Sequence, residues 1–322
     1  MSRCLVLPLV AFSLAVAGCS SGRRAGSGSA GPDTRPRLAD AGLVSTADAG
    51  SRDGSMVDDP PLAECRAVDV LFVIDDSASM ADQQSSLVAS FDGFVRGMRE
   101  RLSSALSFHV GVVTTDTYAY NEPACRDIGD LVTRTGGLES SNATCGPFVS
   151  GGRYMNEAEP ELSSRFACAA RVGIGGDDDE RVARALLNAI SPARNAPGAC
   201  NAGFLREGSL LVVVIISDED DVEDGCMTGG VLDGCLSYGS GGTPDDWVAE
   251  LAAHRDPESV VVLSLIGRRA DNPCGAVVAS RLLGFARRFG DNGYVGDVCA
   301  ASYDEFFREA LPIIDEACVA LI

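Results

Sequence analysis

A short apolar run that ends in acidic and hydroxyl side chains constrains this chain more than any other feature. Residues 68–74 are mostly β-branched and aromatic, as expected of a strand buried in a parallel sheet. Asp75, Ser77 and Ser79 follow directly, in the spacing Asp-x-Ser-x-Ser. Ligands of open α/β sheets bind beyond the carboxyl ends of the strands, and oxygen ligands select a hard cation such as Mg²⁺. The sequence therefore predicts a buried strand followed by a cation-binding loop.

A second strand-like run supports this reading. Residues 210–216 are continuously apolar and lead into Ser217 and Asp218. The two segments together resemble the von Willebrand factor A (vWA) domain, in which Asp-x-Ser-x-Ser forms the first loop of a metal-ion-dependent adhesion site and a later aspartate forms the third. The resemblance covers residues 65–322. It implies an α/β fold with a doubly wound, mostly parallel sheet flanked by helices, of the vWA or Rossmann-like type.

The resemblance also implies roles for the site residues. Ser77 and Ser79 would ligate a divalent cation directly, and Asp75 and Asp218 would act largely through water. The cation would be Mg²⁺, Mn²⁺ or Ca²⁺. An unknown protein partner would complete the coordination with an acidic side chain.

The second loop departs from the family pattern because the expected threonine is missing. Asp177, Asp178 and Asp179 stand there instead, before a helix predicted at 181–190. Either Asp177 contributes a carboxylate to the metal site, or the site is degenerate and the acids only favour the helix N-terminus. A third carboxylate would make the site net negative, so that it would repel an acidic partner group.

The first 64 residues are predicted to lie outside the globular domain. Residues 1–18 have the basic start and short apolar run of a secretory signal, too short to span a membrane. The ending Val-Ala-Gly-Cys resembles a bacterial lipobox, which implies lipid on Cys19, with an ordinary cleaved signal as the alternative. Ser20 after this cysteine suggests the outer membrane as the destination. Residues 19–64 are rich in small and polar residues and predict a flexible linker.

The cysteines predict a disulfide framework in the exported domain. Ten remain beyond Cys19, and no Cys-x-x-Cys spacing suggests zinc. An irregular, disulfide-stapled insertion is expected at about 117–166. Five pairs are expected. Proximity in the sequence suggests Cys226–Cys235, Cys274–Cys299, Cys125–Cys145 and Cys168–Cys200, which leaves Cys65–Cys318 to join the two ends of the domain.

Further elements follow the alternation expected of an α/β fold. Apolar spacing predicts a helix after Ser79 and strands at 108–113, 260–266 and 293–295. Thr243 followed by Pro and two acids is a helix start. A helix is expected at 274–289, and Ser302-x-x-Glu305 is expected to cap a terminal one.

The charge of the chain and the residues it lacks exclude several classes of function. The formal net charge is −20 with no lysine, which argues against nucleic-acid binding. The only histidines, His109 and His254, are expected to be structural, and no nucleophile elbow or phosphate-binding loop occurs. We therefore expect a membrane-anchored binding module at the cell envelope and not an enzyme. The alternatives are a structural envelope protein with a degenerate metal site and, less favoured, a metal-dependent hydrolase.

Overall fold

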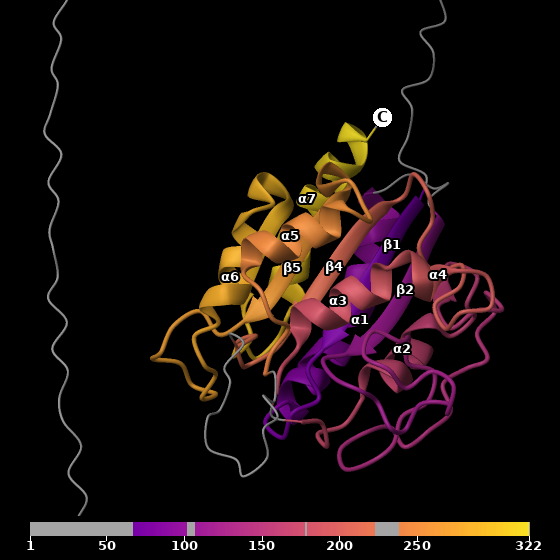
Figure 1. The fold of residues 1–322 in the computed structure, drawn as a ribbon, viewed down its shortest axis with the longest axis horizontal. Helices are drawn as coiled ribbons and strands as arrows, with labels where there is room; N and C mark the ends of the chain where they lie inside the picture. Colours follow the sequence, from indigo (N-terminus) through magenta and orange to yellow (C-terminus); the bar gives the residue numbers. More distant parts are fainter. Residues whose placement is uncertain (1–66, 102–106, 178, 223–237, 322) are drawn as a thin grey trace, which may run out of the picture. The chain divides into compact units, whose positions relative to one another are not determined.

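The structure is a computed structural model that describes residues 67–101, 107–177, 179–222 and 238–321. Its centre is a six-stranded sheet in the order β3-β2-β1-β4-β5-β6, parallel throughout except for β3 (Figure 1). The strands are β1 Ala67–Ile74, β2 Ser107–Thr114, β3 Met155–Asn156, β4 Leu210–Ile216, β5 Val260–Ile266 and β6 Gly293–Asp297. The predicted α/β architecture is confirmed. The predictions for the signal sequence, Cys19 and the linker lie outside the described residues.

The central strands form where the sequence predicts them. Every residue of β4 and β5 is buried, and in β1 every residue after Ala67 is. Strands covered on both faces read as continuous apolar runs, because neither face needs polar side chains. The strand ranges predicted at 210–216 and 260–266 match the observed ones.

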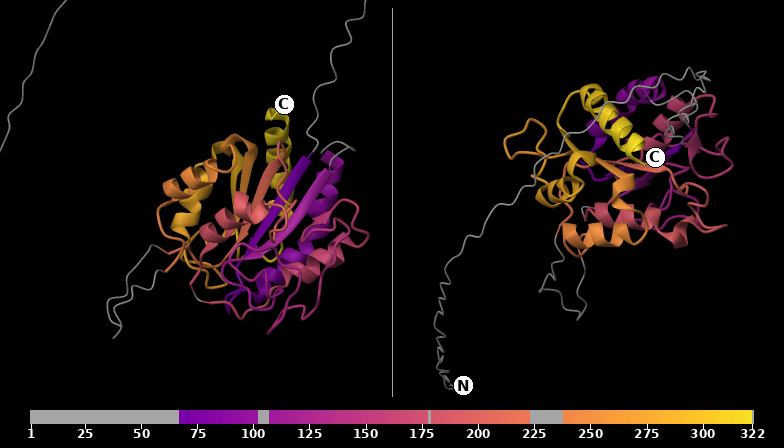
Figure 2. Two further views of the ribbon diagram at one scale, coloured as in Figure 1. Left: turned by 45° about the vertical axis from the view of Figure 1, so that its right-hand side comes forward. Right: turned by 90° about the horizontal axis from the view of Figure 1, so that it is seen from above.

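Helices cover both faces of the sheet (Figure 2). On one face lie α1 Ala81–Arg101, α2 Leu162–Ala170 and α7 Asp304–Ala320; on the other lie α3 Val182–Ile190, α5 Pro244–Ala252 and α6 Ser280–Arg287. The short helices are α4 Pro192–Asn195, η1 Pro257–Ser259 and η2 Gly290–Asn292. Alternate residues of β1 enter the two cores, with Phe72 facing α1 and Val73 facing α3. Within the described ranges, no helix is both long enough and apolar enough to cross a membrane.

The strand order places the two predicted site loops side by side. The chain runs from β1 to β2 on one side of β1 and later returns to β4 on its other side. Ile74 pairs with Ile216, and the Asp75 N–H donates to the Ile216 carbonyl at 3.0 Å. The loops after β1 and β4 therefore meet where the strand order reverses, which is where open α/β sheets bind ligands.

The disulfides correct two of the predicted pairs. Cys125 pairs with Cys200 and Cys145 with Cys168, so the predictions Cys125–Cys145 and Cys168–Cys200 were wrong. Folding brings the turn after α4 back to the insertion, where the Cys200 Sγ lies 3.3 Å from the Ala124 carbonyl. Proximity in the sequence therefore gave the wrong partners for these four cysteines. The prediction Cys274–Cys299 is confirmed. Cys318 is disulfide-bonded; Cys65, Cys226 and Cys235 lie outside the described residues.

Two helix predictions also need correction. The helix expected at 274–289 begins only at Ser280. Gly275 has φ +81°, and the Val277 N–H donates to the Asp218 carbonyl at 2.7 Å, so this segment serves the site loop instead. The terminal helix has Tyr303 at its N-cap without a side-chain cap. The predicted start at Thr243 is confirmed as a capping box with Asp246.

Candidate metal centre

Asp75 ties together the loops that meet at the reversal point. Its buried carboxylate accepts the Ser77 N–H at 2.8 Å on one oxygen and the Ser217 hydroxyl at 2.7 Å on the other. Gln84, from α1, donates to the Asp75 carbonyl at 3.1 Å and to the Gly173 carbonyl at 2.8 Å. Three loops, after β1, after α2 and after β4, are therefore fixed to one another around this carboxylate.

Beside Asp75, three oxygen atoms from Ser77, Ser79 and Asp218 form a row in which each contacts the next. The Ser77 and Ser79 Oγ atoms lie 3.5 Å apart, and the Ser79 hydroxyl donates to Asp218 Oδ1 at 3.0 Å. Neighbouring ligands around an octahedral ion are separated by ~3.0 Å for Mg²⁺ and by ~3.3–3.7 Å for Ca²⁺, given their usual ligand distances. The spacing of these oxygens therefore fits a small divalent cation. Ser77 and Asp218 are buried whereas Ser79 is exposed, so the row opens toward solvent.

The second loop presents a residue that the sequence analysis did not select. Asp177 is exposed, and its N–H donates to Asp116 Oδ2 at 2.7 Å. Glu180 is only 1% exposed, and neither of its carboxylate oxygens has a hydrogen-bond partner. Glu180 is the last acid of the run before α3. That position in the sequence was the only indication that it could belong to the site.

Burial dominates the electrostatics of this group. Burial and the charge of Asp75 together raise the pKa of Glu180 to about 10, although the nearby Thr115 hydroxyl opposes them. Burial also raises the pKa of Asp75 and of Asp218, although hydrogen bonds from Ser217 and Ser79 oppose it. A buried carboxylate without a partner is costly unless it is neutralised or bound to a cation. The residues present therefore suit a divalent cation.

A second candidate cluster fails the same chemical test. Among the described residues, there is one group of three or more acidic, histidine or cysteine side chains whose ligand atoms all lie within 4.8 Å of one another. This group is formed by Cys125, Asp130 and Cys200. The two cysteines form a disulfide and offer no thiolate, and Asp130 pairs with Arg194 at 2.7 Å. This cluster is structural. The carboxylates at the strand ends do not gather so closely, so the serine hydroxyls are needed to complete a site there.

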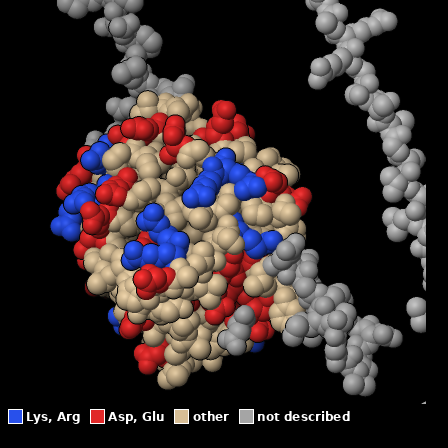
Figure 3. All heavy atoms as spheres, turned by 90° about the vertical axis from the view of Figure 1, so that its left-hand side faces the viewer, with Lys and Arg blue, Asp and Glu red and all other residues tan. Residues whose placement is uncertain are grey.

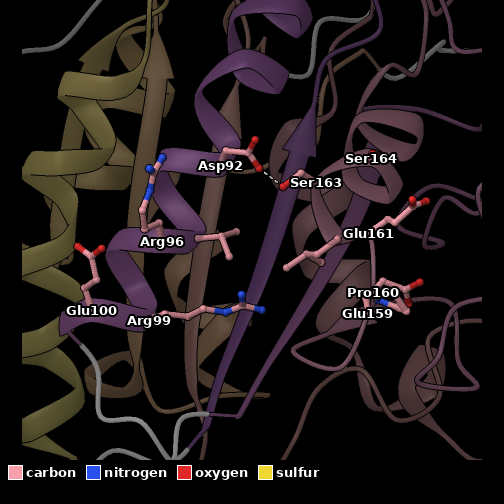
Figure 4. A pocket seen from close by; sticks show the side chains of 11 residues that line it. Asp92, Arg96, Arg99, Glu100, Glu159, Pro160, Glu161, Ser163 and Ser164 are labelled. Atoms are coloured by element: carbon pink, nitrogen blue, oxygen red, sulfur yellow. Dashed lines mark hydrogen bonds between the residues drawn. The ribbon is translucent and has the colours of Figure 1, made fainter.

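The described surface also has a charged hollow away from these loops. A hollow of about 740 Å³ between α1 and residues 159–164 is lined by both signs of charge, including Arg96, Arg99, Glu100 and Glu161 (Figure 4). Asp92 accepts a hydrogen bond from Ser163 across it. On the α6 side of the molecule, basic and acidic side chains lie interspersed (Figure 3).

Comparisons with known proteins give only distant structural likeness. No family model matches the chain, and no curated protein matches it. Proximal thread matrix protein 1 from the mussel byssus is 12% identical over 78% of this chain and 48% of its own, with a TM-score of 0.40. The pilus adhesin SpaC from Lactobacillus rhamnosus GG, in its open conformation, is 14% identical over 77% of this chain and 30% of its own, with a TM-score of 0.41. The chain thus spans less than half the length of either.

Proposed function

We propose that this chain is a protein-binding module of the vWA type whose binding surface depends on a divalent cation. The observation that carries the proposal is the row of oxygens from Ser77, Ser79 and Asp218 at the reversal point of the sheet. A lipid on Cys19 and the linker 19–64 would present the module at the cell envelope, on the outer membrane. In membrane fractionation, the Cys19→Ser variant is then expected in the soluble fraction or as unprocessed precursor; unchanged fractionation and processing would refute the anchor.

The positions of the residues suggest which of them would bind the cation directly and which through water. Ser77, Ser79 and Asp218 would hold the cation directly. Asp75 and Glu180 would hold it through water, since Asp75 is bonded to Ser77 and its charge acts on Glu180. When bound, the cation would neutralise these buried carboxylates and fix the three loops in one arrangement. In this proposal Glu180 takes the place expected for Asp177, because Glu180 is buried without a partner and Asp177 is exposed.

The charge of the centre limits the partner. When a bound cation holds all three ionised, Asp75, Glu180 and Asp218 carry more negative charge than one dication balances, so an acidic group of a partner would be repelled. Exposed apolar side chains lie on loops bonded to the centre. Leu138 is 70% exposed and its carbonyl accepts the Ile174 N–H, and Val277 is 53% exposed and its N–H donates to Asp218. We therefore propose a partner that buries apolar residues on these loops and supplies no carboxylate.

Calorimetric titration of the purified chain with Mg²⁺, Mn²⁺ and Ca²⁺ tests the cation. Wild type is expected to bind, and Ser77→Ala and Asp218→Asn are expected to lose at least tenfold in affinity, roughly the effect of losing one metal ligand. Ser85→Ala removes an exposed hydroxyl from α1 and is expected to leave binding unchanged. No heat for any ion with wild type would remove the metal proposal and leave the structural envelope protein. In the same preparations we expect no phosphoester turnover; turnover that Asp218→Asn abolishes would favour the hydrolase.

A further inference from the structure

A second pair of buried carboxylates lies beside the proposed centre and is not used by it. Asp76 follows β1 and is 3% exposed, and Asp116 follows β2 and is 6% exposed. Asp76 Oδ1 and Asp116 Oδ1 each lack a hydrogen-bond partner. Because β1 and β2 are adjacent parallel strands, both carboxyl groups stand at the same edge of the sheet. Two neighbouring buried acids therefore each hold an unsatisfied oxygen.

One loop covers both carboxyl groups with consecutive residues. The Gly176 N–H donates to the Asp76 carbonyl at 2.8 Å, and the Asp177 N–H donates to Asp116 Oδ2 at 2.7 Å. A Cβ at Gly176 would stand 2.9 Å from Asp76 Oδ1 and 2.7 Å from its carboxyl carbon. Since residues 176 and 177 are adjacent, these contacts place oxygens of the two carboxylates within about 9 Å of one another, and the charge of Asp116 acts on Asp76. The loop therefore covers both carboxyl groups.

The charges in this region exceed what one dication can balance. Asp75, Asp76, Asp116, Glu180 and Asp218 are all buried. The basic side chain that acts on Asp116 is Arg181, and it also faces Asp179 at 3.5 Å. If all five were ionised, one dication and Arg181 would leave two of these negative charges uncompensated, and Arg181 also has Asp179 to balance. Buried charges persist only when paired or bound to a metal, so a second dication would complete the balance.

We propose a second divalent-cation site between Asp76 and Asp116, beneath the loop at Gly176 and Asp177. The Thr115 hydroxyl is the neutral oxygen beside this space, next to both Asp76 and Glu180. The charges of Asp75 and Asp76 both act on Glu180, so it lies near residues of both sites. Oxygen donors of this kind select Mg²⁺, Mn²⁺ or Ca²⁺. The second site rests on its own residues and does not require partner binding.

The number of ions bound per chain tests the site. Equilibrium dialysis of the purified chain against Mn²⁺ and against Ca²⁺ is expected to give two ions for wild type and one for Asp116→Asn. Gly176→Ala keeps every carboxylate, but its methyl group would stand 2.7 Å from the Asp76 carboxyl carbon and displace that carboxyl group. This variant is also expected to bind one ion. Asp177→Asn is the matched control because it changes an exposed carboxylate of the same loop, and it is expected to bind two.

The variants separate the two sites. Asp218→Asn is expected to retain one ion, and combining it with Asp116→Asn is expected to leave none. One ion in wild type that Asp116→Asn abolishes and Asp218→Asn spares would uphold the second site and refute the first. One ion in wild type that Asp116→Asn and Gly176→Ala leave in place would overturn the second site, and so would no ion at all. Circular dichroism and mapping of the disulfides Cys125–Cys200, Cys145–Cys168 and Cys274–Cys299 check that each variant is folded.

Discussion

The two ends of β1 carry buried acids in opposite circumstances. At the amino end, Asp69 is fully buried and accepts the Arg206 N–H at 2.8 Å, the Arg206 Nε–H at 2.7 Å and the Ser209 hydroxyl at 2.6 Å. Arg255 extends this network by donating to Ser209 at 2.9 Å. Beyond the carboxyl end, Asp76 and Glu180 are as deeply buried, yet three of their four carboxylate oxygens lack partners.

This difference separates a structural acid from one that is arranged to bind something. The protein supplies the cation for Asp69 from its own Arg206, so the pair is complete in the folded chain. Within the described part of the chain, no basic side chain forms an ion pair with Glu180. Buried unsatisfied groups lower stability, and natural proteins retain them mainly at functional sites. The contrast is therefore the strongest physical reason to look for ligands at the carboxyl end.

Neutralising Asp69 should have the largest effect on stability. Asp69→Asn leaves the Arg206 guanidinium, which is 23% exposed, without its counter-charge. Breaking a buried pair costs roughly 3–5 kcal/mol, and partial exposure of the arginine places the expected loss near ~3 kcal/mol. Denaturant unfolding in EDTA and in excess Ca²⁺ measures it, and the loss should be the same in both conditions.

The matched control is Asp245→Asn. Asp245 also pairs with an arginine, Arg288, at 2.7 Å, but it is fully exposed. We expect no measurable change in the free energy of unfolding. If the two variants lost equal stability, burial would not be what distinguishes the Asp69 network.

The fold was accessible from the sequence because the central strands are buried on both faces. Residues 210–216 and 260–266 are apolar without interruption, so their pattern carried the prediction alone. The antiparallel β3 and the helix α2 were missed, because β3 is only two residues long and α2 lies at the end of an irregular insertion. The exchanged disulfide partners of Cys125 and Cys145 show that pairing is decided by tertiary contacts, which spacing does not encode.

The candidate site could be predicted from the sequence only in part, because some of its residues do not follow a recognisable strand. Asp75, Ser77, Ser79 and Asp218 follow recognisable strands, so topology brings them together as expected. Glu180 sits in a run of acids whose members look alike in the sequence. Only the turn of the loop decides which of them is buried, and that turn depends on contacts with Asp76 and Asp116.

Neutralising Glu180 should change stability in the opposite direction from Asp69. Burial raises the pKa of Glu180, so its carboxyl group must take up a proton when the chain folds at neutral pH. Glu180→Gln places an amide there that is neutral in both states, and we expect the metal-free protein to become more stable by about 1 kcal/mol. The gain should be confined to EDTA, because added Ca²⁺ should stabilise the variant less than wild type. Denaturant unfolding under both conditions measures both effects.

Glu159→Gln is the comparison that sharpens this prediction. Glu159 is also buried, but it accepts the Val149 N–H at 2.8 Å and faces Arg165 at 3.6 Å. Its neutralisation is expected to lower stability by about 1–2 kcal/mol. Loss of stability in both glutamine variants would mean that Glu180 has partners of its own, and the contrast between the ends of the sheet would fail.

The smallest expected effect tests whether the amino end is as fully satisfied as its hydrogen bonds indicate. His109 on β2 contacts the Phe204 carbonyl through Nδ1 at 2.8 Å and lies 3.6 Å from Asp69. Burial lowers the pKa of His109 below its usual value, and the Arg206 charge adds to this, while the Phe204 hydrogen bond and the charges of Asp69 and Glu157 oppose it. The unfolded chain takes up a proton below about pH 6.5 whereas the folded chain stays neutral, so the stability present above that pH is lost as the pH falls.

Comparison with His109→Gln isolates this contribution, because the other titrating groups are common to both proteins. Between pH 6.5 and 5.5, wild type should lose less than about 1 kcal/mol relative to the variant. Urea unfolding at several pH values in EDTA measures the difference. A difference that grows in favour of wild type on acidification would show that Asp69 pairs with a charged His109. Asp69 would then share its charge between two cations, and the amino end would be a titratable network instead of a closed structural pair.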